Sequence, residues 1–308
     1  RSSDLPKADK LSVAAWASVP KDCDSEDYYY GVEGAPDYKS ARACALKNED
    51  PSSNPFRRLV LAMLYANGQG VAPNLALAIS LICSEDEGVR PGESSFTTPV
   101  AELAAAVGNP RVTSAVHFDM CEWGPTPFND HCEAVRATRD ANDRQRRLKA
   151  VTATWPAATM SAFQRVAVTN AEFRDAIVTG EVDTRGTSRN FQYSDKARQA
   201  ESSLVAMLES LEQSTLPAVS DAGLAALDAE LNNVYRTLSK SEALNDVDQI
   251  SAGAVSFAGI RQDQRAWLRY RDAWVAFAAQ KYPHVPKRNV IAQLTQERLS
   301  QLAEFTDY

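Results

Sequence analysis

The sequence lacks any apolar run long enough to cross a membrane. Its longest apolar runs, LVLAMLYA at 59–66 and LALAISLIC at 75–83, fall well short of the roughly 18 residues that a spanning helix requires. It also lacks an initiator methionine and a hydrophobic signal segment. The chain opens with RSSDLPKADK, so we expect a mature form whose export signal has been removed and which has no transmembrane segment.

The common catalytic and nucleotide-binding motifs are also missing. There is no G-x-S-x-G elbow, no phosphate-binding G-x-x-x-x-G-K-[ST] loop and no H-E-x-x-H pair. Only three histidines occur, His117, His131 and His284, and we interpret each as an ordinary surface or core residue rather than a general base. A cell-wall glycosidase with paired carboxylates would need an aromatic-lined cleft, which no pattern indicates. We therefore predict a protein that is not an enzyme and needs no cofactor.

Basic residues are outnumbered by acidic ones. The 308 residues include 33 Lys and Arg against 40 Asp and Glu, which gives a net charge of −7 and a pI near 5.2. This balance argues against a nucleic-acid partner and favours a cationic one. The hydrophobic content of 44% is ordinary for a globular protein with a buried core, and the length favours two or three helical units.

Two segments of the first hundred residues align without a gap at a spacing of 37. YYYGVEGAPDYKSA, from Tyr28, lies over YANGQGVAPNLALA, from Tyr65 (65 − 28 = 37), with Gly31 over Gly68 and Asp37 over Asn74. Such a period predicts stacked helical hairpins, each with a glycine turn and an Asp or Asn cap on its second helix. The second copy closely resembles a SEL-one-like repeat, which implies a scaffold for protein–protein contacts, and the first is a degenerate version. The segment PVAELAAAVGN is predicted to add a capping helix.

Five cysteines can supply two disulfides and one thiol. Cys23 and Cys44 fall on the two helices of the first hairpin, so a bridge across it is expected. Cys121 and Cys132 flank a turn with Gly and Pro, so we expect a short closed loop, with Cys83 reduced and buried in an apolar helix. The alternative is a metal site of Cys121, His131 and Cys132. However, neighbouring His and Cys form an unusual chelate and no fourth ligand is evident, so no metal is predicted.

Strand-like alternation is nearly absent from the rest of the chain, which predicts an all-α fold. A charged helix is expected from about 129 to 149, and Trp155-Pro156 ends it. A second helix runs to about Gly180, and a third covers 189–212 with Leu204, Met207, Leu208 and Leu211 on one face. We expect helical-hairpin repeats with the cysteine loop (1–128), then a long-helix bundle (129–215), then a small three-helix domain (216–308).

The last ninety residues contain three amphipathic helical stripes. The first comprises Leu224, Leu227, Leu231, Tyr235 and Leu238; the second comprises Trp267, Tyr270, Arg271, Trp274, Val275 and Ala278; the third comprises Ile291, Leu294, Arg298, Leu302 and Phe305. We interpret Trp267 and Trp274 as core anchors. Arg271 and Asp272 lie about 100° apart on the helix, so we expect them not to pair with each other. Instead, Arg271 is predicted to find a buried partner and Asp272 to bond to Thr295 or Arg298, as an internal polar clamp.

Three motifs occur in order here: LDAELNNVYRTL, QRAWLRYRDAWVAF and QLTQERLSQL. Together they resemble the LprI-type domain of bacterial lysozyme inhibitors, over about a third of the chain. The residues that carry the resemblance are Leu227, Leu231, Tyr235, Gln264, Trp267, Arg271, Asp272, Leu294, Thr295 and Arg298. The family usually has cysteines where this chain has Val275 and Val290, so we expect a hydrophobic contact in place of a bond.

The resemblance implies an exported bacterial protein, periplasmic or extracellular, that binds and inhibits lysozyme without catalysis. The expected partner is a cationic lysozyme or another envelope protein, attracted by carboxylate-rich loops at 22–27 and 84–88 and by the Cys121–Cys132 loop. The candidate contact residues are Asp24, Glu26, Asp27, Glu85, Asp86, Glu122 and Trp123. The alternative is a periplasmic interaction module, such as an immunity protein that neutralises a delivered toxin through the repeat half.

Overall fold

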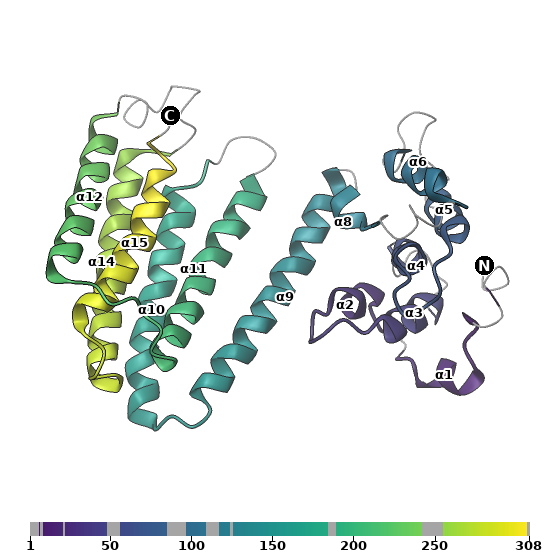
Figure 1. Ribbon diagram of the computed structural model, residues 1–308, viewed down its shortest axis with the longest axis horizontal. Helices are drawn as coiled ribbons and strands as arrows, with labels where there is room; N and C mark the ends of the chain where they lie inside the picture. The colour runs from purple at the N-terminus through teal and green to yellow at the C-terminus, as the bar shows by residue number, and fades with distance from the viewer. Residues whose placement is uncertain are drawn as a thin grey trace. The chain divides into compact units, whose positions relative to one another are not determined.

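The computed structural model describes residues 6, 9–20, 22–47, 56–84, 97–108, 117–123, 126–183, 189–241 and 255–306. Thirteen α-helices and no β-strand occur within these ranges (Figure 1). The predicted all-α fold is confirmed. The chain divides into two compact units, residues 1–143 and 144–308, and the division falls inside the long helix α9 (Thr126–Thr152). The finer three-part division at 128 and 215 stays a prediction.

Unit 1 is built around one almost wholly buried helix, α4 (Arg57–Asn67), in which nine residues are buried. Helices α3 and α5 pack against it, and α6 packs on α5. The apolar run LVLAML in α4 has no polar face, which is typical of a helix covered on all sides. The other helices of the unit are α1 (Val13–Ser18), α2 (Ser25–Tyr30), α3 (Tyr38–Lys47), α5 (Leu75–Cys83), α6 (Thr97–Ala106) and α8 (Met120–Trp123).

The hairpins α2–α3 and α4–α5 close in the same way. Gly31 and Gly68 follow the first helix of each hairpin with φ of 67° and 65°, the left-handed conformation that favours glycine. The N–H of Asp37 donates to the Tyr28 carbonyl over 2.9 Å, and the N–H of Asn74 donates to the Tyr65 carbonyl over 2.9 Å.

Both predicted caps are also present. The side chains of Asp37 and Asn74 accept from the N–H groups of Ser40 and Leu77 at the start of the second helices. The assignment of these hairpins to the SEL-one-like repeats stays a prediction.

Both predicted disulfides are present in unit 1, Cys23–Cys44 and Cys121–Cys132. Cys23 lies just before α2 rather than on it. Cys83 is free of a disulfide as expected, but the prediction that it is buried is wrong, because its side chain is exposed. Helix α5 buries Leu75, Ala78 and Ile82. Cys83 follows Ile82 by one residue, which turns it about 100° away from that face.

Unit 2 is a bundle with one continuous core. Its helices, besides the end of α9, are α10 (Ala157–Gly180), α11 (Arg189–Glu212), α12 (Asp221–Lys240), α14 (Phe257–Lys281) and α15 (Lys287–Ala303). Helix α10 packs along α14 and α11, and α15 packs against α12 and α14. Trp155-Pro156 separates α9 from α10, and α11 has the predicted bounds. The core runs without a break from α10 to α15.

Two tryptophans of α14 lie at the centre of this core. Trp267 and Trp274 are 2% and 0% exposed, which confirms their interpretation as core anchors. Trp274 contacts the Phe277 ring edge-on, with centroids 5.9 Å apart. At the two positions where we expected a hydrophobic contact in place of a disulfide, Val290 is fully buried and Val275 is partly buried against the same core.

Helices α10 and α14 approach most closely at two glycines. A Cβ atom added at Gly259 would lie 3.0 Å from both the Cα and the carbonyl oxygen of Gly180. A Cβ at Gly180 would in turn collide with the carboxyl group of Asp263. Glycine at both positions therefore allows the two backbones to come together, and it makes room for a buried carboxyl group beside them.

Candidate functional site

A groove with a volume of about 440 Å³ lies between α12 and α14. Helix α12 contributes side chains at a spacing of three and four residues, and α14 contributes a second stripe opposite it. The lining residues are Asp228, Leu231, Asn232 and Tyr235 from α12, and Arg261, Gln264, Arg265, Trp267, Leu268 and Arg271 from α14. The groove thus lies between two amphipathic helices that both pack against α15, and long polar side chains line it.

The groove has an apolar base and a cationic wall. Leu231 and Trp267 are buried, whereas Arg261 and Arg265 are exposed. The Tyr235 ring packs against the Phe257 ring, with ring centroids 5.1 Å apart. Burial raises the pKa of Tyr235, and the positive charges of Arg261 and Arg265 act against that rise.

The third arginine of this wall is paired. Arg271 Nη2 lies 3.0 Å from Asp272 Oδ1, and the guanidinium lies 5.3 Å from the centre of the Trp267 ring. The expectation that Arg271 and Asp272 do not pair is therefore wrong. Their Cβ atoms diverge, but the arginine side chain is long enough to bend back to its neighbour. Asp272 is mostly exposed, and its recorded bond is to Arg271 rather than to Thr295 or Arg298.

The internal polar clamp is made by Arg298 instead. This residue of α15 is fully buried, and its Nη2 donates to Glu181 Oε1 over 2.6 Å. Its Nε donates to Gln264 Oε1 over 2.9 Å, and its Nη1 donates to Gln301 Oε1 over 3.2 Å. A guanidinium can only donate, so it fixes the amide of Gln264 with the oxygen toward Arg298. The NH₂ of Gln264, a residue that lines the groove, is left as a donor.

A second buried carboxyl group, Asp263, lies within reach of the same arginine. Burial raises the pKa of Asp263 to about 7; the charge of Glu181 raises it further, and that of Arg298 opposes the rise. Asp263 Oδ2 is buried without a hydrogen bond in the described part of the chain. Arg298 thus pairs with Glu181 and favours the ionised form of Asp263 less strongly than burial opposes it, so Asp263 titrates near neutral pH.

Residues 207–302 match the family model of the lysozyme inhibitor LprI. An LprI domain therefore occupies the C-terminal part of the chain. The match begins in the last two turns of α11, covers α12 and α14 and ends in α15. No curated protein and no solved structure matches the chain.

The LprI domain contains every residue that lines the groove. Of the residues that carried the resemblance in the sequence, Leu231, Tyr235, Gln264, Trp267 and Arg271 meet there. Thr295 and Arg298 are fully buried in α15, and Arg298 reaches the groove through Gln264. The exposed Arg261 and Arg265 were missed, although their spacing from Leu268 (i, i+4, i+7) marks a common helix face.

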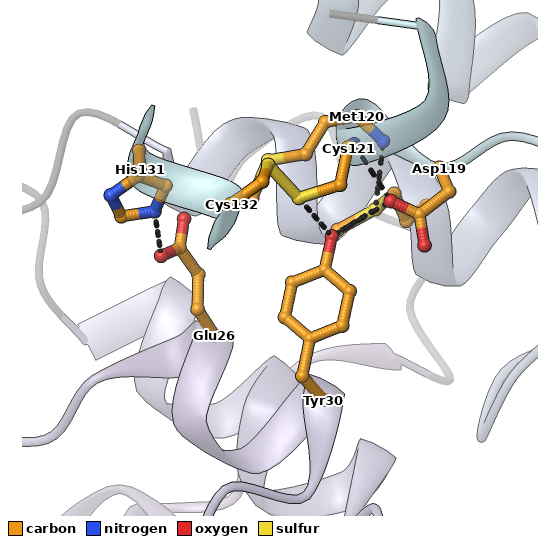
Figure 2. Close-up of a disulfide and its surroundings, with 8 residues drawn as sticks. Glu26, Tyr30, Asp119, Met120, Cys121, His131 and Cys132 are labelled. Atoms are coloured by element: carbon orange, nitrogen blue, oxygen red, sulfur yellow. Dashed lines mark hydrogen bonds and ion pairs between the residues drawn. A yellow bond between two sulfur atoms is a disulfide. The ribbon is translucent and has the colours of Figure 1, made fainter. Parts of the chain in front are cut away.

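A second polar cluster surrounds the Cys121–Cys132 disulfide in unit 1 (Figure 2). Tyr30 Oη donates to Asp119 Oδ1 over 2.8 Å and lies 3.2 Å from Cys121 Sγ. The alternative of a metal site, which the sequence did not favour, does not fit this geometry, because the two sulfurs are bonded to each other and His131 is directed at Glu26. In the described ranges, no group of His, Cys, Asp and Glu side chains has the arrangement of a metal site.

Glu26 and His131 form a close pair, with Oε2 2.5 Å from Nε2. Burial raises the pKa of Glu26 to about 8, with further contributions from Asp24 and Asp27, and burial lowers the pKa of His131. Ionisation of both groups would create an ion pair, but the cost of burying two charges opposes it. Burial therefore favours the neutral pair, in which the protonated Glu26 carboxyl donates to the imidazole.

The predicted acidic contact residues all belong to unit 1 and precede the LprI match in the sequence. Asp24 and Asp27 are exposed, but Asp24 also caps α2 by accepting from the Glu26 N–H. Glu26 is buried, so its prediction as a surface contact is wrong: residues 25–30 form a helix rather than an acidic loop. Glu122 is exposed at α8, whose last residue is Trp123. Glu85 and Asp86 lie outside the described residues.

Proposed function

We propose that this protein inhibits lysozyme, by a non-catalytic mechanism, in the periplasm or outside the cell. The observation that carries the proposal is the match of residues 207–302 to the lysozyme inhibitor family. The two disulfides suit an oxidising compartment. Among the described helices, none combines the length and apolar composition that a membrane span requires.

Charge supports a cationic partner enzyme. The chain carries a net charge of −7. Asp27 and Glu122 in unit 1 have exposed carboxylates, and these negative charges would attract a cationic lysozyme. Such exposed charges act mainly on the rate of association and less on the lifetime of a complex. We propose that they draw the enzyme in, and that a fitted contact then blocks its cleft.

The test is a titration of a cationic animal-type lysozyme with the full-length protein. Lysis of bacterial cell walls and hydrolysis of a soluble N-acetylglucosamine oligomer are followed in parallel, at low and at moderate salt. We expect stoichiometric inhibition of both substrates that persists at moderate salt. Absence of inhibition, or inhibition that disappears with salt, would show that the match reflects a shared helical fold without the shared activity.

A matched pair of variants tests the acidic residues. D27N/E122Q should slow association at low salt and leave the dissociation rate unchanged. E102Q/E230Q removes the same charge at two other exposed carboxylates and is the control. Equal association rates for the two variants would show that Asp27 and Glu122 do not attract the enzyme. The proposed inhibition itself would not be contradicted.

A further inference from the structure

We propose that the groove between α12 and α14 binds a carboxylate-bearing peptide of the bacterial cell wall. This deepens the proposed function and rests on it, because the cell wall is the substrate that lysozyme attacks. The domain would then hold the substrate as well as oppose the enzyme. Two observations support the proposal: the groove has hydrogen-bond donors without partners among the described residues, and it is positively charged.

Unused hydrogen-bond donors are gathered on the α14 wall. The side chains of Arg261 and Arg265 form no hydrogen bond or ion pair with any residue that the structure describes, although both line the groove. The arrangement behind the groove adds a third donor, since Arg298 takes the oxygen of Gln264 and leaves its NH₂ free. Two guanidinium groups and an amide NH₂ on one wall suit a carboxylate, whose oxygens only accept.

The opposite wall supplies the complementary group. Asp228 of α12 lines the groove, and its carboxylate also has no partner in the described ranges. A peptide could therefore place its carboxylate against α14 and an amine or amide N–H against Asp228. The apolar base, formed by Leu231 and Trp267, suits the short aliphatic part between those two groups.

Charge distinguishes this ligand from lysozyme itself. The lining contains one aspartate and three arginines, of which Arg271 is paired with Asp272, so the groove keeps a positive charge in a chain whose net charge is −7. A cationic lysozyme surface would be repelled at this place, whereas the cell-wall peptides, with their free carboxylates, would be attracted. The groove and the exposed carboxylates of Asp27 and Glu122 in unit 1 thus suit two different partners.

The experiment is calorimetric titration of the full-length protein with the soluble disaccharide–peptides released by complete lysozyme digestion of cell walls. Two comparison ligands are the same fragments with their carboxylates amidated and a peptide-free N-acetylglucosamine oligomer. We expect binding of the unmodified fragments, at least tenfold weaker binding after amidation, and no binding of the oligomer. Failure of the wild-type protein to bind the fragments would overturn the proposal.

Two double variants with equal charge change locate the site. R261E/R265E should weaken fragment binding at least tenfold, while R165E/K287E, at exposed positions outside the groove, should leave it unchanged. Matching thermal melts of both variants and the wild type would exclude unfolding as the cause. Equal binding by R261E/R265E and wild type would overturn the proposal.

The outcome for the proposed function is separate. Suppose that R261E/R265E loses affinity for lysozyme and that the wild type does not bind the cell-wall fragments. The groove then contacts the enzyme, and only the proposal of peptide binding fails. If the protein binds fragments but does not slow hydrolysis of the peptide-free oligomer, the groove assignment stands and enzyme-directed inhibition fails. The two readouts therefore distinguish the proposals.

Discussion

Arg298 of α15 donates to Glu181 at the end of α10 over 2.6 Å, and the two side chains are 0% and 1% exposed. The partners are far apart in the sequence, so the bond fastens the last helix of the LprI domain to a helix that precedes the match. The same guanidinium also holds Gln264 at the groove. Stability and groove geometry are thereby linked through one side chain.

Replacement of Arg298 by methionine should destabilise unit 2 strongly. R298M leaves Glu181 buried without a cation, which typically costs about 3–5 kcal/mol in the free energy of unfolding. The double variant R298M/E181M removes both charges and should recover most of that loss. Urea unfolding measures both, with R165M at an exposed arginine expected within about 0.5 kcal/mol of wild type. A double variant as unstable as R298M would contradict the assigned pairing.

Alanine at Gly259 should destabilise the α10–α14 contact by about 1–3 kcal/mol, because its Cβ would press on the Gly180 backbone. The loss should appear even though alanine favours the helix over glycine by about 1 kcal/mol. Gly34 is the control, since a Cβ there meets nothing within 4 Å. Thermal unfolding compares G259A with G34A, and an equal melting temperature for both would rule out a tight approach of the two helices.

The Glu26–His131 pair should make stability depend on pH. The folded-state pKa of Glu26 is about 8, above its ordinary value of 4.5, so between these values the unfolded chain releases a proton that the folded chain keeps. Stability therefore falls as pH rises through this window. Below about 6.5, His131 acts in the opposite direction, because its folded-state pKa is lowered and only the unfolded chain takes up the proton.

The variant E26Q isolates the contribution of this carboxyl group. Between pH 6.5 and 8 the wild type should lose about 2 kcal/mol relative to E26Q, because the glutamine amide replaces the protonated carboxyl and cannot ionise. E122Q, at an exposed glutamate, should follow the wild type. Urea unfolding at the two pH values gives the comparison, and parallel curves for wild type and E26Q would mean that Glu26 is ionised throughout.

One thiol per chain should react in the native protein. Cys83 is exposed and free, while the other four cysteines are paired, so a thiol reagent should count one group before reduction and five after reduction and unfolding. C83S should abolish the native reaction and leave stability within about 0.5 kcal/mol. C121S/C132S should lose about 3 kcal/mol, the contribution of a loop of this length. Two or three reactive native thiols would contradict the pairing.

Local patterns in the sequence determined most of the helices. The bounds of α11 and the break at Trp155-Pro156 follow from apolar periodicity and proline chemistry, which act within a few residues. The caps at Asp37 and Asn74 are equally local. Such features need no knowledge of the tertiary fold, so they could be predicted.

Several errors concern contacts between distant segments, whereas the Arg271–Asp272 pair and the exposure of Cys83 are local features that were also mispredicted. The burial of Glu26 depends on His131, 105 residues away, and the partner of Arg298 is 117 residues away. Nothing within a helical turn of either residue identifies these partners. The arginine stripe on α14 was visible in the sequence, but the groove was not, because its second wall belongs to α12 and its depth depends on how the two helices pack.

The distribution of cysteines has a consequence for how the chain matures. Both disulfides lie in unit 1, and residues 144–308 contain no cysteine. Unit 2, which holds the LprI domain, can therefore reach its native state without an oxidant, whereas unit 1 waits for thiol oxidation, which takes seconds to hours. The LprI domain can thus be folded while unit 1 still depends on thiol oxidation to close its two disulfides.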